Sequence, residues 1–487
     1  MGEIPLLGVA HVLIGSALSL HLLLTKQKPV SAVLWLAVVW GIPYAGALAY
    51  LGFGVDRISR RANLRQASRA YVAGRAAAHP TFGHWALPES HGAPFGRDAN
   101  PASHIFRATD PAVRPNRVLR GNRARLLVDG DEYYPDLFAA IEDARDSVHL
   151  QTFIIRRDGT GRELVGRLAE RARAGVEVRL LYDRFGSTIA HLTRFFEPAR
   201  RAGARVSSIT QANVLKGHFQ VNLRNHRKVV VIDGRIGYLG GMNIHDENVR
   251  GRSGGLPIRD YQVRLEGPAV ADLQFQFVAD WPFATGESPE VLLGSRCSPR
   301  PAPAGAGLVQ IVAGGPELEG RGLADAIFGA IVSAERSITI VTPYFVPDEP
   351  ILQGLRYAAL RGVDVRLVLP ARNNHWYTGM AARALYGPLL AAGVRIFERR
   401  PPFLHAKAML IDGVYAMVGS ANLDHRSLCL SFETNAEIVE ATFVERLREQ
   451  IGREIEASVE VTAEVHDRRP VTRRLVENLC FLFQPLL

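Results

Sequence analysis

Cysteine is scarce in this chain. Its 487 residues include only Cys297, Cys429 and Cys480, which are widely spaced and odd in number. Neither a framework of disulfide bonds nor a zinc site built from paired cysteines has this pattern. The scarcity excludes a small disulfide-stabilised fold and makes a reducing compartment the simplest inference.

Charged residues are absent from two long stretches near the N-terminus, residues 4–25 and 29–55. Each stretch exceeds the roughly 20 residues that a helix needs to cross the hydrocarbon core of a membrane. A basic start and a small-residue cleavage site are also lacking, which argues against a cleaved signal peptide. We therefore expect a two-helix transmembrane hairpin over residues 1–56. A pair of buried core helices is the alternative.

Basic residues flank both uncharged stretches. Lys26 and Lys28 lie in the turn between them, and five arginines follow the second: Arg57, Arg60, Arg61, Arg65 and Arg69. Since loops rich in Lys and Arg stay in the cytoplasm, the richer side predicts a multi-pass protein of the inner (plasma) membrane with the rest of the chain in the cytoplasm. The net charge of +10 and the pI of about 9.7 favour an anionic membrane surface or nucleic acid as partner, although a generally basic solvated surface explains them better.

The remainder of the chain repeats itself. Residues 57–116 have no clear periodicity and are predicted to form a basic, irregular linker. Three segments then recur about 190 residues later, 140–152 at 330–342, 174–179 at 361–366 and 202–206 at 392–396. Helices that alternate with short apolar strands indicate α/β layers around a buried sheet. We expect duplicated domains at 117–297 and 308–487, joined by the Pro-rich stretch around residues 298–307.

Each repeat carries the same motif late in its length. The first copy contains His226, Lys228 and Asp233, and the second contains His405, Lys407 and Asp412, with identical spacing. A small-residue pair and an asparagine follow each copy: Gly240, Gly241 and Asn243, then Gly419, Ser420 and Asn422.

The motif has the groups that phosphoryl chemistry requires. In a strand, residues two apart point to the same face, so each histidine and lysine project together. A nucleophile, a cation and an amide donor converge in this way on phosphate oxygens, and glycine lets the backbone approach the same group. A lone His-x-Lys pair would be an ordinary surface pair, but two copies at equivalent places in a repeat indicate a site.

Residues 117–487 resemble the phospholipase D superfamily, whose mark is a duplicated His-Lys-Asp motif. More narrowly, the chain looks like bacterial cardiolipin synthases, on the strength of the two N-terminal stretches and of the strings 240–244, 266–270, 342–348 and 419–427. The resemblance implies two phospholipase-D-like α/β domains packed with pseudo-twofold symmetry around one active site.

The resemblance also implies roles for these residues. One histidine attacks phosphorus to give a phosphohistidine, and the other protonates the leaving oxygen and then deprotonates the incoming alcohol. By analogy with relatives we expect His226 to be the nucleophile and His405 the acid and base, although the symmetry of the sequence alone does not decide. Lys228, Lys407, Asn243 and Asn422 would bind the phosphate oxygens beside Gly241 and Ser420. Asp233 and Asp412 complete the motif and are expected to organise loops rather than touch substrate.

Orienting carboxylates are expected downstream of each motif, and Asp260 and Glu433 fit those places, with ordinary surface acids as the alternative. Ser431 departs from the family, which usually has Asn there, and this weakens the case for Glu433.

The implied reaction is transfer of a phosphatidyl group from one phosphatidylglycerol to another, giving cardiolipin and glycerol. No metal and no cofactor are expected, because two lysines already oppose the phosphate. The partners would be anionic phospholipids and the membrane rather than nucleic acid, and an oligomer is possible. A hydrolase of the phospholipase D type, another phosphatidyltransferase, a nucleic-acid phosphodiesterase and a non-catalytic lipid-binding scaffold are the alternatives.

Overall fold

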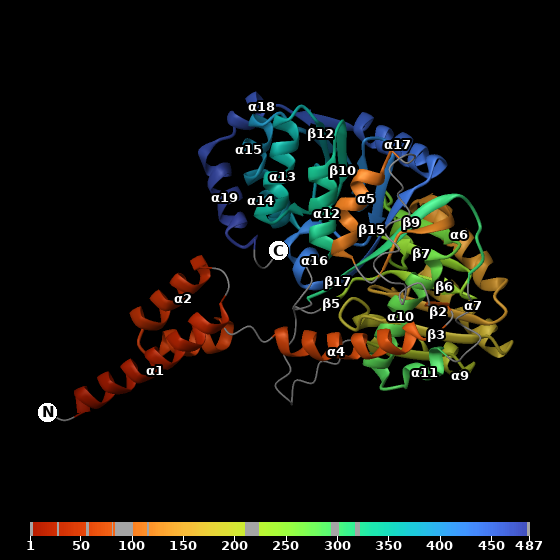
Figure 1. Ribbon diagram of the computed structural model, residues 1–487, viewed down its shortest axis with the longest axis horizontal. Helices are drawn as coiled ribbons and strands as arrows, with labels where there is room; N and C mark the ends of the chain where they lie inside the picture. The colour runs from red at the N-terminus through yellow and green to blue at the C-terminus, as the bar shows by residue number, and fades with distance from the viewer. Residues whose placement is uncertain are drawn as a thin grey trace. The chain divides into compact units, whose positions relative to one another are not determined.

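The computed structural model describes residues 3–26, 29–54, 58–79, 81–82, 101–113, 116–209, 224–293, 301–316 and 322–484. Lys28, Arg57, Cys297 and part of the predicted joining stretch at 298–307 lie outside these ranges. The chain divides into two compact units, Met1–Ala62 and Asn63–Leu487, which are described separately (Figure 1).

The N-terminal unit begins with an antiparallel pair of helices, α1 (Glu3–Thr25) and α2 (Pro29–Gly41). The indole nitrogen of Trp40 donates to the Ser19 hydroxyl at 2.9 Å and so ties the end of α2 to the middle of α1. Among the described helices, only α1 is both long and apolar enough to cross a membrane, over Leu7–Thr25 with a mean hydropathy of 1.9.

The second apolar stretch, predicted to supply the second helix of the transmembrane hairpin, is not one continuous helix over residues 29–54. Helix α2 has 13 residues, which extend about 20 Å at the usual rise and fall short of the roughly 30 Å hydrocarbon core. Pro43 follows it, and a proline can neither donate a backbone hydrogen bond nor accommodate the carbonyl four residues earlier. Tyr44 then takes a positive φ of 60°. The chain turns at residues 42–44 before the short α3 (Ala45–Ala49) and the π-helical η1 (Tyr50–Gly54).

This second half of the apolar run folds back along α2. Gly46 lies against the backbone of Val38, where an added Cβ would be 2.0 Å from the carbonyl oxygen. The ring of Tyr50 packs on Trp35, with centroids 5.4 Å apart, and lies 6.1 Å from the ring of His21. Residues 50–54 have therefore returned toward the turn that joins α1 to α2.

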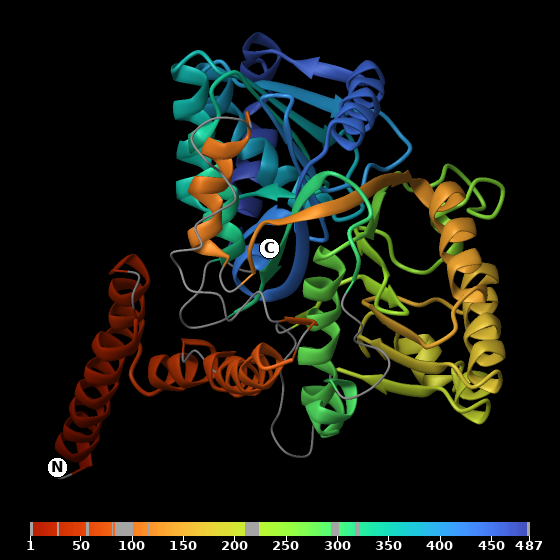
Figure 2. The same cartoon turned by 45° about the vertical axis from the view of Figure 1, so that its right-hand side comes forward.

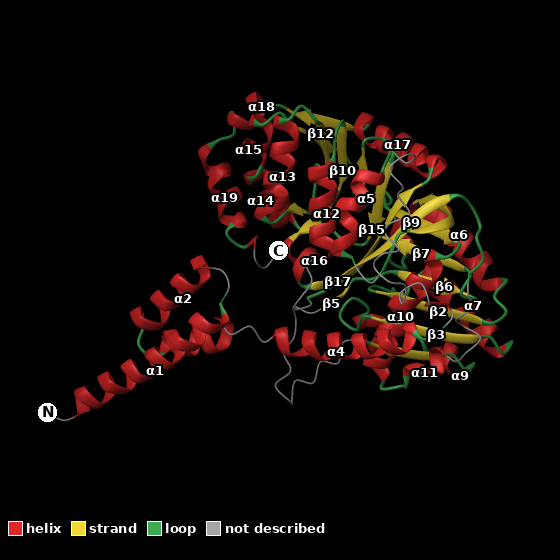
Figure 3. Cartoon of the chain, in the orientation of Figure 1, coloured by secondary structure: helices red, strands yellow, loops and turns green. Residues whose placement is uncertain are grey.

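The second unit is an α/β fold built on one sheet of sixteen strands (Figure 3). In the order β18-β13-β12-β10-β14-β15-β17-β9-β1-β8-β7-β6-β2-β3-β4, neighbouring strands are hydrogen-bonded, and β5 pairs with β17. The strands of the first part are β1 (Leu119–Val128), β2 (Ser147–Thr152), β3 (Glu177–Tyr182), β4 (Arg205–Ser208), β5 (Arg224–Asn225), β6 (Val229–Ile232), β7 (Ile236–Gly240) and β8 (Tyr261–Glu266). Those of the second part are β9 (Gly307–Gly314), β10 (Ser337–Val341), β12 (Asp364–Pro370), β13 (Arg395–Arg399), β14 (Ala408–Ile411), β15 (Tyr415–Gly419), β17 (Ser431–Val439) and β18 (Ser458–Val461).

The two parts of the sheet share one pairing pattern. Strands β2, β3 and β4 are parallel, and β6, β7, β8 and β1 continue antiparallel from β2. Strands β10, β12 and β13 are parallel, and β14, β15, β17 and β9 continue antiparallel from β10. The parts join where β1 pairs with β9. A separate ladder joins β11 (Phe345–Val346) to β16 (Leu423–Asp424).

Helices cover both faces of the sheet (Figure 2). In the first part these are α6 (Asp129–Glu142), α7 (Gly159–Arg173), α8 (Thr188–Leu192), α9 (Glu197–Arg201), α10 (Ala269–Thr285) and α11 (Pro289–Leu293), with α4 (Ile58–Ala77) beside α10. In the second part they are α5 (Ser103–Thr109), α12 (Gly322–Ser333), α13 (Glu349–Leu360), α14 (Trp376–Ala384), α15 (Tyr386–Ala391), α16 (His425–Cys429), α17 (Ala441–Glu456), α18 (Ala463–Asp467) and α19 (Val471–Phe481). Single 3-10 turns lie at Asp110–Ala112 and Asp246–Asn248.

One apolar core runs through both parts of the sheet. Leu126 of β1 and Val263 of β8 belong to the same buried cluster as Ile311 of β9 and Ile438 of β17. Leu447 of α17, in the second part, belongs to the same cluster. Because burial of apolar surface is the main stabilising term in folding, this shared core fixes the two parts against each other.

The motif aspartates lie in the turns that end the motif strands. After the buried strand β6, the carboxylate of Asp233 accepts the backbone N–H groups of Arg145, Asp146 and Ser147. After β14, Asp412 accepts those of Glu335, Arg336 and Ser337 in the same way. Both aspartates have positive φ and are followed by a glycine with positive φ, the combination favoured in tight hairpin turns. They hold turns at the far ends of the motif strands.

Candidate active site

A cavity of about 440 Å³ opens at the junction of the two parts of the sheet. Equivalent residues of the two motifs line this cavity: His226, Lys228 and Asn243 from the first, and His405, Lys407 and Asn422 from the second. Ser420 also lines it, whereas Asp233 and Asp412 do not. Gly241 lies behind the lining, against Asp260, where an added Cβ would be 2.2 Å from a carboxylate oxygen.

Each histidine and lysine precede their buried strand and project to one side. The Lys228 ammonium donates to the carbonyl of His226 at 2.7 Å, and the Lys407 ammonium lies 3.0 Å from both ring nitrogens of His405. Both lysines are almost fully buried. The short segment before each strand thus places the imidazole and ammonium groups of its motif side by side.

Each motif histidine is paired with a carboxylate from the opposite half of the chain. Nδ1 of His405 lies 2.6 Å from Asp260, and Nδ1 of His226 lies 3.2 Å from Glu433. The second oxygen of Glu433 accepts the hydroxyl of Ser420 at 2.5 Å. Both carboxylates are buried, so they are not ordinary surface acids. The sequence suggested the two acids but did not assign either to a histidine.

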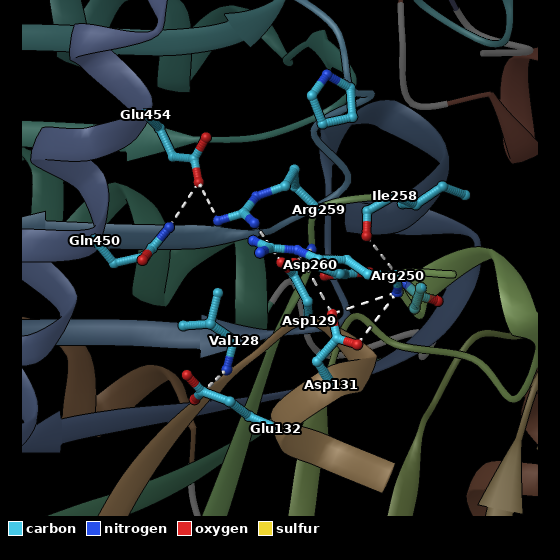
Figure 4. A network of polar contacts seen from close by, with 12 residues as sticks. Val128, Asp129, Asp131, Glu132, Arg250, Ile258, Arg259, Asp260, Gln450 and Glu454 are labelled. Carbon is cyan, nitrogen blue, oxygen red and sulfur yellow. Dashed lines mark hydrogen bonds and ion pairs between the residues drawn. The ribbon is translucent and has the colours of Figure 1, made fainter. Parts of the chain in front are cut away.

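A network of ion pairs between the halves holds Asp260 in place (Figure 4). Its backbone N–H donates to Asp129 at 3.0 Å, and the neighbouring Arg259 pairs with both Asp129 and Glu454 of α17. The backbone N–H of His405 donates to the carbonyl of Arg259 at 2.7 Å. The segment that carries Asp260, just before β8, is therefore bound directly to the segment that carries His405.

Arg227, the middle residue of the first motif, is a structural residue that the sequence did not single out. Its guanidinium points away from the cavity and donates to the buried Asp280 of α10 at 2.7 Å. It also donates to the carbonyl oxygens of Glu433 and Gly314, in the second half of the chain. Arg65 of α4 pairs with the same Asp280, and these cations hold the pKa of that carboxyl well below its usual range. Because His226 faces the cavity, the next residue is expected to face away from it. The sequence does not predict that Arg227 then pairs with Asp280.

Burial and nearby like charges lower the pKa values of the ionisable groups that line the cavity. Burial and the nearby Lys407 lower the pKa of His405 to about 4, against the opposing effect of Asp260. Burial lowers the pKa of Lys407 to about 7, although Asp260 raises it. The pKa values of His226 and Lys228 are also lowered, chiefly by burial. At neutral pH the two imidazoles are therefore neutral, and Lys407 is close to its titration midpoint.

The two asparagines differ in their contacts. The side-chain oxygen of Asn243 accepts the backbone N–H of Ile154 at 3.1 Å, which leaves its amide N–H groups to face the cavity. The amide of Asn422 donates to the hydroxyl of Ser427 at 3.2 Å. Two arginines that the sequence did not identify as binding residues, Arg224 and Arg426, also line the cavity.

The lowered pKa of Lys407 gives a test that needs no substrate. The lysines of the chain are Lys26, Lys28, Lys216, Lys228 and Lys407, so peptide mapping resolves each of them. Trace acetylation with labelled acetic anhydride, scaled to an added peptide amine, should show Lys407 becoming reactive with a midpoint near pH 7, since only the neutral amine reacts. In the Asp260→Asn protein the midpoint should fall further, because the Asp260 charge raises the pKa. A midpoint near 10, the usual lysine value, would contradict this assignment.

Comparison with known proteins places the chain in a family. A family model described as "Cardiolipin synthase, PLD-like domain" matches twice, at residues 137–266 and 327–455. Cardiolipin synthase A of Pseudomonas aeruginosa is 37% identical over 99% of this chain and 96% of its own length. Cardiolipin synthase of Geobacillus kaustophilus is 34% identical over 100% of this chain and 95% of its own.

A solved structure shares the fold. The phosphatidylserine synthase of Haemophilus influenzae superposes with a TM-score of 0.59 at 13% identity, over 78% of this chain and 97% of that one. The likeness shows a shared fold. The double match of the family model and the relatives matched over almost their whole length show that the chain belongs to the cardiolipin synthase family of phospholipase-D-like proteins.

Proposed function

We propose that this protein transfers a phosphatidyl group from one phosphatidylglycerol to another, which yields cardiolipin and glycerol. The observation that carries the proposal is the pair of carboxylate-supported histidines, each beside a buried lysine, around one cavity. The names of the relatives supply the substrate class, since they are called cardiolipin synthases.

The reaction would proceed in two displacements at phosphorus. The ring nitrogen of His226 that faces away from Glu433 attacks the donor, a phosphorus–nitrogen bond forms, and the bond to the glycerol oxygen breaks. His405 gives that oxygen its proton, and free glycerol leaves. The hydroxyl of the second phosphatidylglycerol then loses its proton to His405 and attacks phosphorus, which breaks the bond to His226. Lys228, Lys407, Asn243 and Asn422 would stabilise the nonbridging oxygens.

The contacts of the two carboxylates favour this division of roles. Asp260 lies 2.6 Å from His405, closer than the 3.2 Å between Glu433 and His226. A closer carboxylate stabilises an imidazolium more strongly, which suits the histidine that carries the proton, although burial and Lys407 outweigh the effect of Asp260 on the pKa of His405. The lowered pKa of His226 keeps its imidazole neutral, as a nucleophile must be. The negative charge of an arriving phosphodiester would raise the pKa of His405 and let it take up a proton.

We further propose that the catalytic part consists of two duplicated phospholipase-D-like domains, 117–297 and 308–487, related by pseudo-twofold symmetry. The matching order of parallel and antiparallel pairings supports this proposal, as does the double match of one family model. The exchange of Asp260 and Glu433 between the halves is the relation that a twofold axis through the cavity would produce. The segment 57–116 would then connect the membrane-embedded unit to these domains.

The N-terminal unit supports a membrane location and a particular topology. We propose that α1 crosses the inner membrane once and that residues 29–54 enter it and return to the side they started from. The break at Pro43 and the contact of Tyr50 with Trp35 support this path. Lys26 and Lys28 would then lie on the same side as Arg57, Arg60 and Arg61, so all the flanking positive charge is cytoplasmic. The catalytic domains stay in the cytoplasm, as the two-span hairpin also predicts, but the first residues lie on the outer side.

Helix α19 offers the catalytic unit its own apolar surface. Its inner side contributes Cys480 to a cluster with Ala381 of α14, whereas Leu475, Leu479 and Leu482 are exposed along its outer side. Arg473 and Arg474 lie on the same short helix. An apolar side flanked by basic residues is suited to the surface of an anionic leaflet, which supports a lipid substrate over nucleic acid.

The transfer reaction can be tested with purified full-length protein and labelled phosphatidylglycerol in mixed micelles. Cardiolipin and glycerol should appear in equal amounts, and His226→Ala or His405→Ala should lower the rate at least about a thousandfold, because each removes a group that acts on the reacting atoms. His191→Ala, which removes a histidine outside the cavity lining, is the control. Phosphatidic acid as main product would indicate a hydrolase, and cleavage of DNA without lipid turnover a nuclease. An active His226→Ala protein would refute the histidine mechanism.

Cysteine labelling in spheroplasts tests the topology. Single substitutions Glu3→Cys and Gln27→Cys are compared with the parent protein, using a membrane-impermeant maleimide. The proposed path predicts that residue 3 reacts in intact spheroplasts and residue 27 only after permeabilisation. The opposite pattern would establish two complete spans with the turn outside.

A further inference from the structure

Two arginines from opposite halves of the chain line the same cavity as the histidines. Arg224 lies on β5 and Arg426 on α16. The Arg224 guanidinium stacks 3.6 Å above the ring of Phe185, another lining residue. Each residue lies close to a repeated motif, since Arg224 is two residues before His226 and Arg426 follows Asn422 by four.

The two guanidinium groups are close enough to act on each other and on the proposed nucleophile. Burial, and next the charge of Arg426, lower the pKa of Arg224 to about 10. The charge of Arg426 also lowers the pKa of His226. Asp183 and Asp424 are acids that act on this pair of arginines, and they accept backbone N–H groups from Asn225 at 3.3 Å and from Ser427 at 2.7 Å.

The lining of the cavity holds more cations than the two lysines of the motifs. Lys228 and Lys407, with the two asparagines, already oppose the single negative charge of one phosphodiester. Arg224 and Arg426 add two further cations on the same lining. In the proposed reaction the acceptor is itself a phosphodiester, whose phosphate is only a three-carbon glycerol bridge away from the attacking hydroxyl. A guanidinium matches phosphate oxygens with paired N–H donors.

We propose that Arg224 and Arg426 form a second phosphodiester site, which binds the phosphate of the acceptor lipid and so directs its glycerol hydroxyl toward the phosphorus held on His226. This inference rests on the proposed function. It makes the enzyme selective for an anionic lipid acceptor over small neutral alcohols and water, because those lack the second phosphate.

Two reactions of the same enzyme distinguish the proposed acceptor site from the donor site. Cardiolipin formation uses an acceptor that carries a phosphate, whereas exchange of labelled glycerol into phosphatidylglycerol uses the same donor and a neutral acceptor. In Arg224→Gln and Arg426→Gln proteins the ratio of cardiolipin formation to glycerol exchange should fall about 10- to 100-fold, the change expected when a charge-assisted hydrogen bond is lost. Arg224→Lys and Arg426→Lys should recover part of the ratio. Arg372→Gln, which alters an exposed arginine outside the cavity lining, should keep the wild-type ratio.

An unchanged ratio would overturn the second site. If both reactions fall together in the Gln proteins, the arginines serve the donor phosphate or the fold. If neither falls, they bind no substrate. Wild-type protein that exchanges glycerol but makes no cardiolipin would instead overturn the proposed function, and this inference with it, so the two failures are distinguishable.

Discussion

The exchange of carboxylates between the two halves is the interaction on which the site depends. Asp260 of the first half reaches His405, and Glu433 of the second half reaches His226. Neither half therefore contains a histidine with its own orienting acid. The pairing of β1 with β9 and the apolar core that both halves share hold this arrangement together. Arg259 and Arg227 strengthen it, since each binds groups of both halves.

The exchanged carboxylates also bear on how charged side chains can be buried around a site for an anionic substrate. A buried cation is tolerated where carboxylates and carbonyl groups meet it. Burial lowers the pKa values of Lys228 and Lys407, although nearby carboxylates oppose this effect. The negative charge of a phosphodiester would raise these pKa values and favour the protonated lysines. Substrate binding and the protonation needed for catalysis are thus linked by the same electrostatics.

The sequence was informative where chemistry depends on local spacing. The two-residue alternation of a strand was enough to place His226 with Lys228 and His405 with Lys407 on one side. The crossed pairing of Asp260 and Glu433 could not be predicted, because it depends on contacts between segments about 145 and 207 residues apart in the chain. The pairing of Arg227 with Asp280 could not be predicted for the same reason. The second apolar run shows a different limit: absence of charge predicts one span, although Gly41 and Pro43 mark a break in the helix.

The proposed mechanism divides two chemical roles between the two histidines of one cavity. Mapping of a trapped intermediate tests this division: the full-length enzyme is quenched during turnover of labelled phosphatidylglycerol with denaturant at mildly alkaline pH, because acid hydrolyses the phosphorus–nitrogen bond, and the modified peptide is identified by mass spectrometry. We expect a phosphatidyl group on His226, and more of it in a His405→Ala protein supplied with a donor whose leaving group needs no proton. A label on His405, or turnover without any covalent intermediate, would contradict the proposed mechanism.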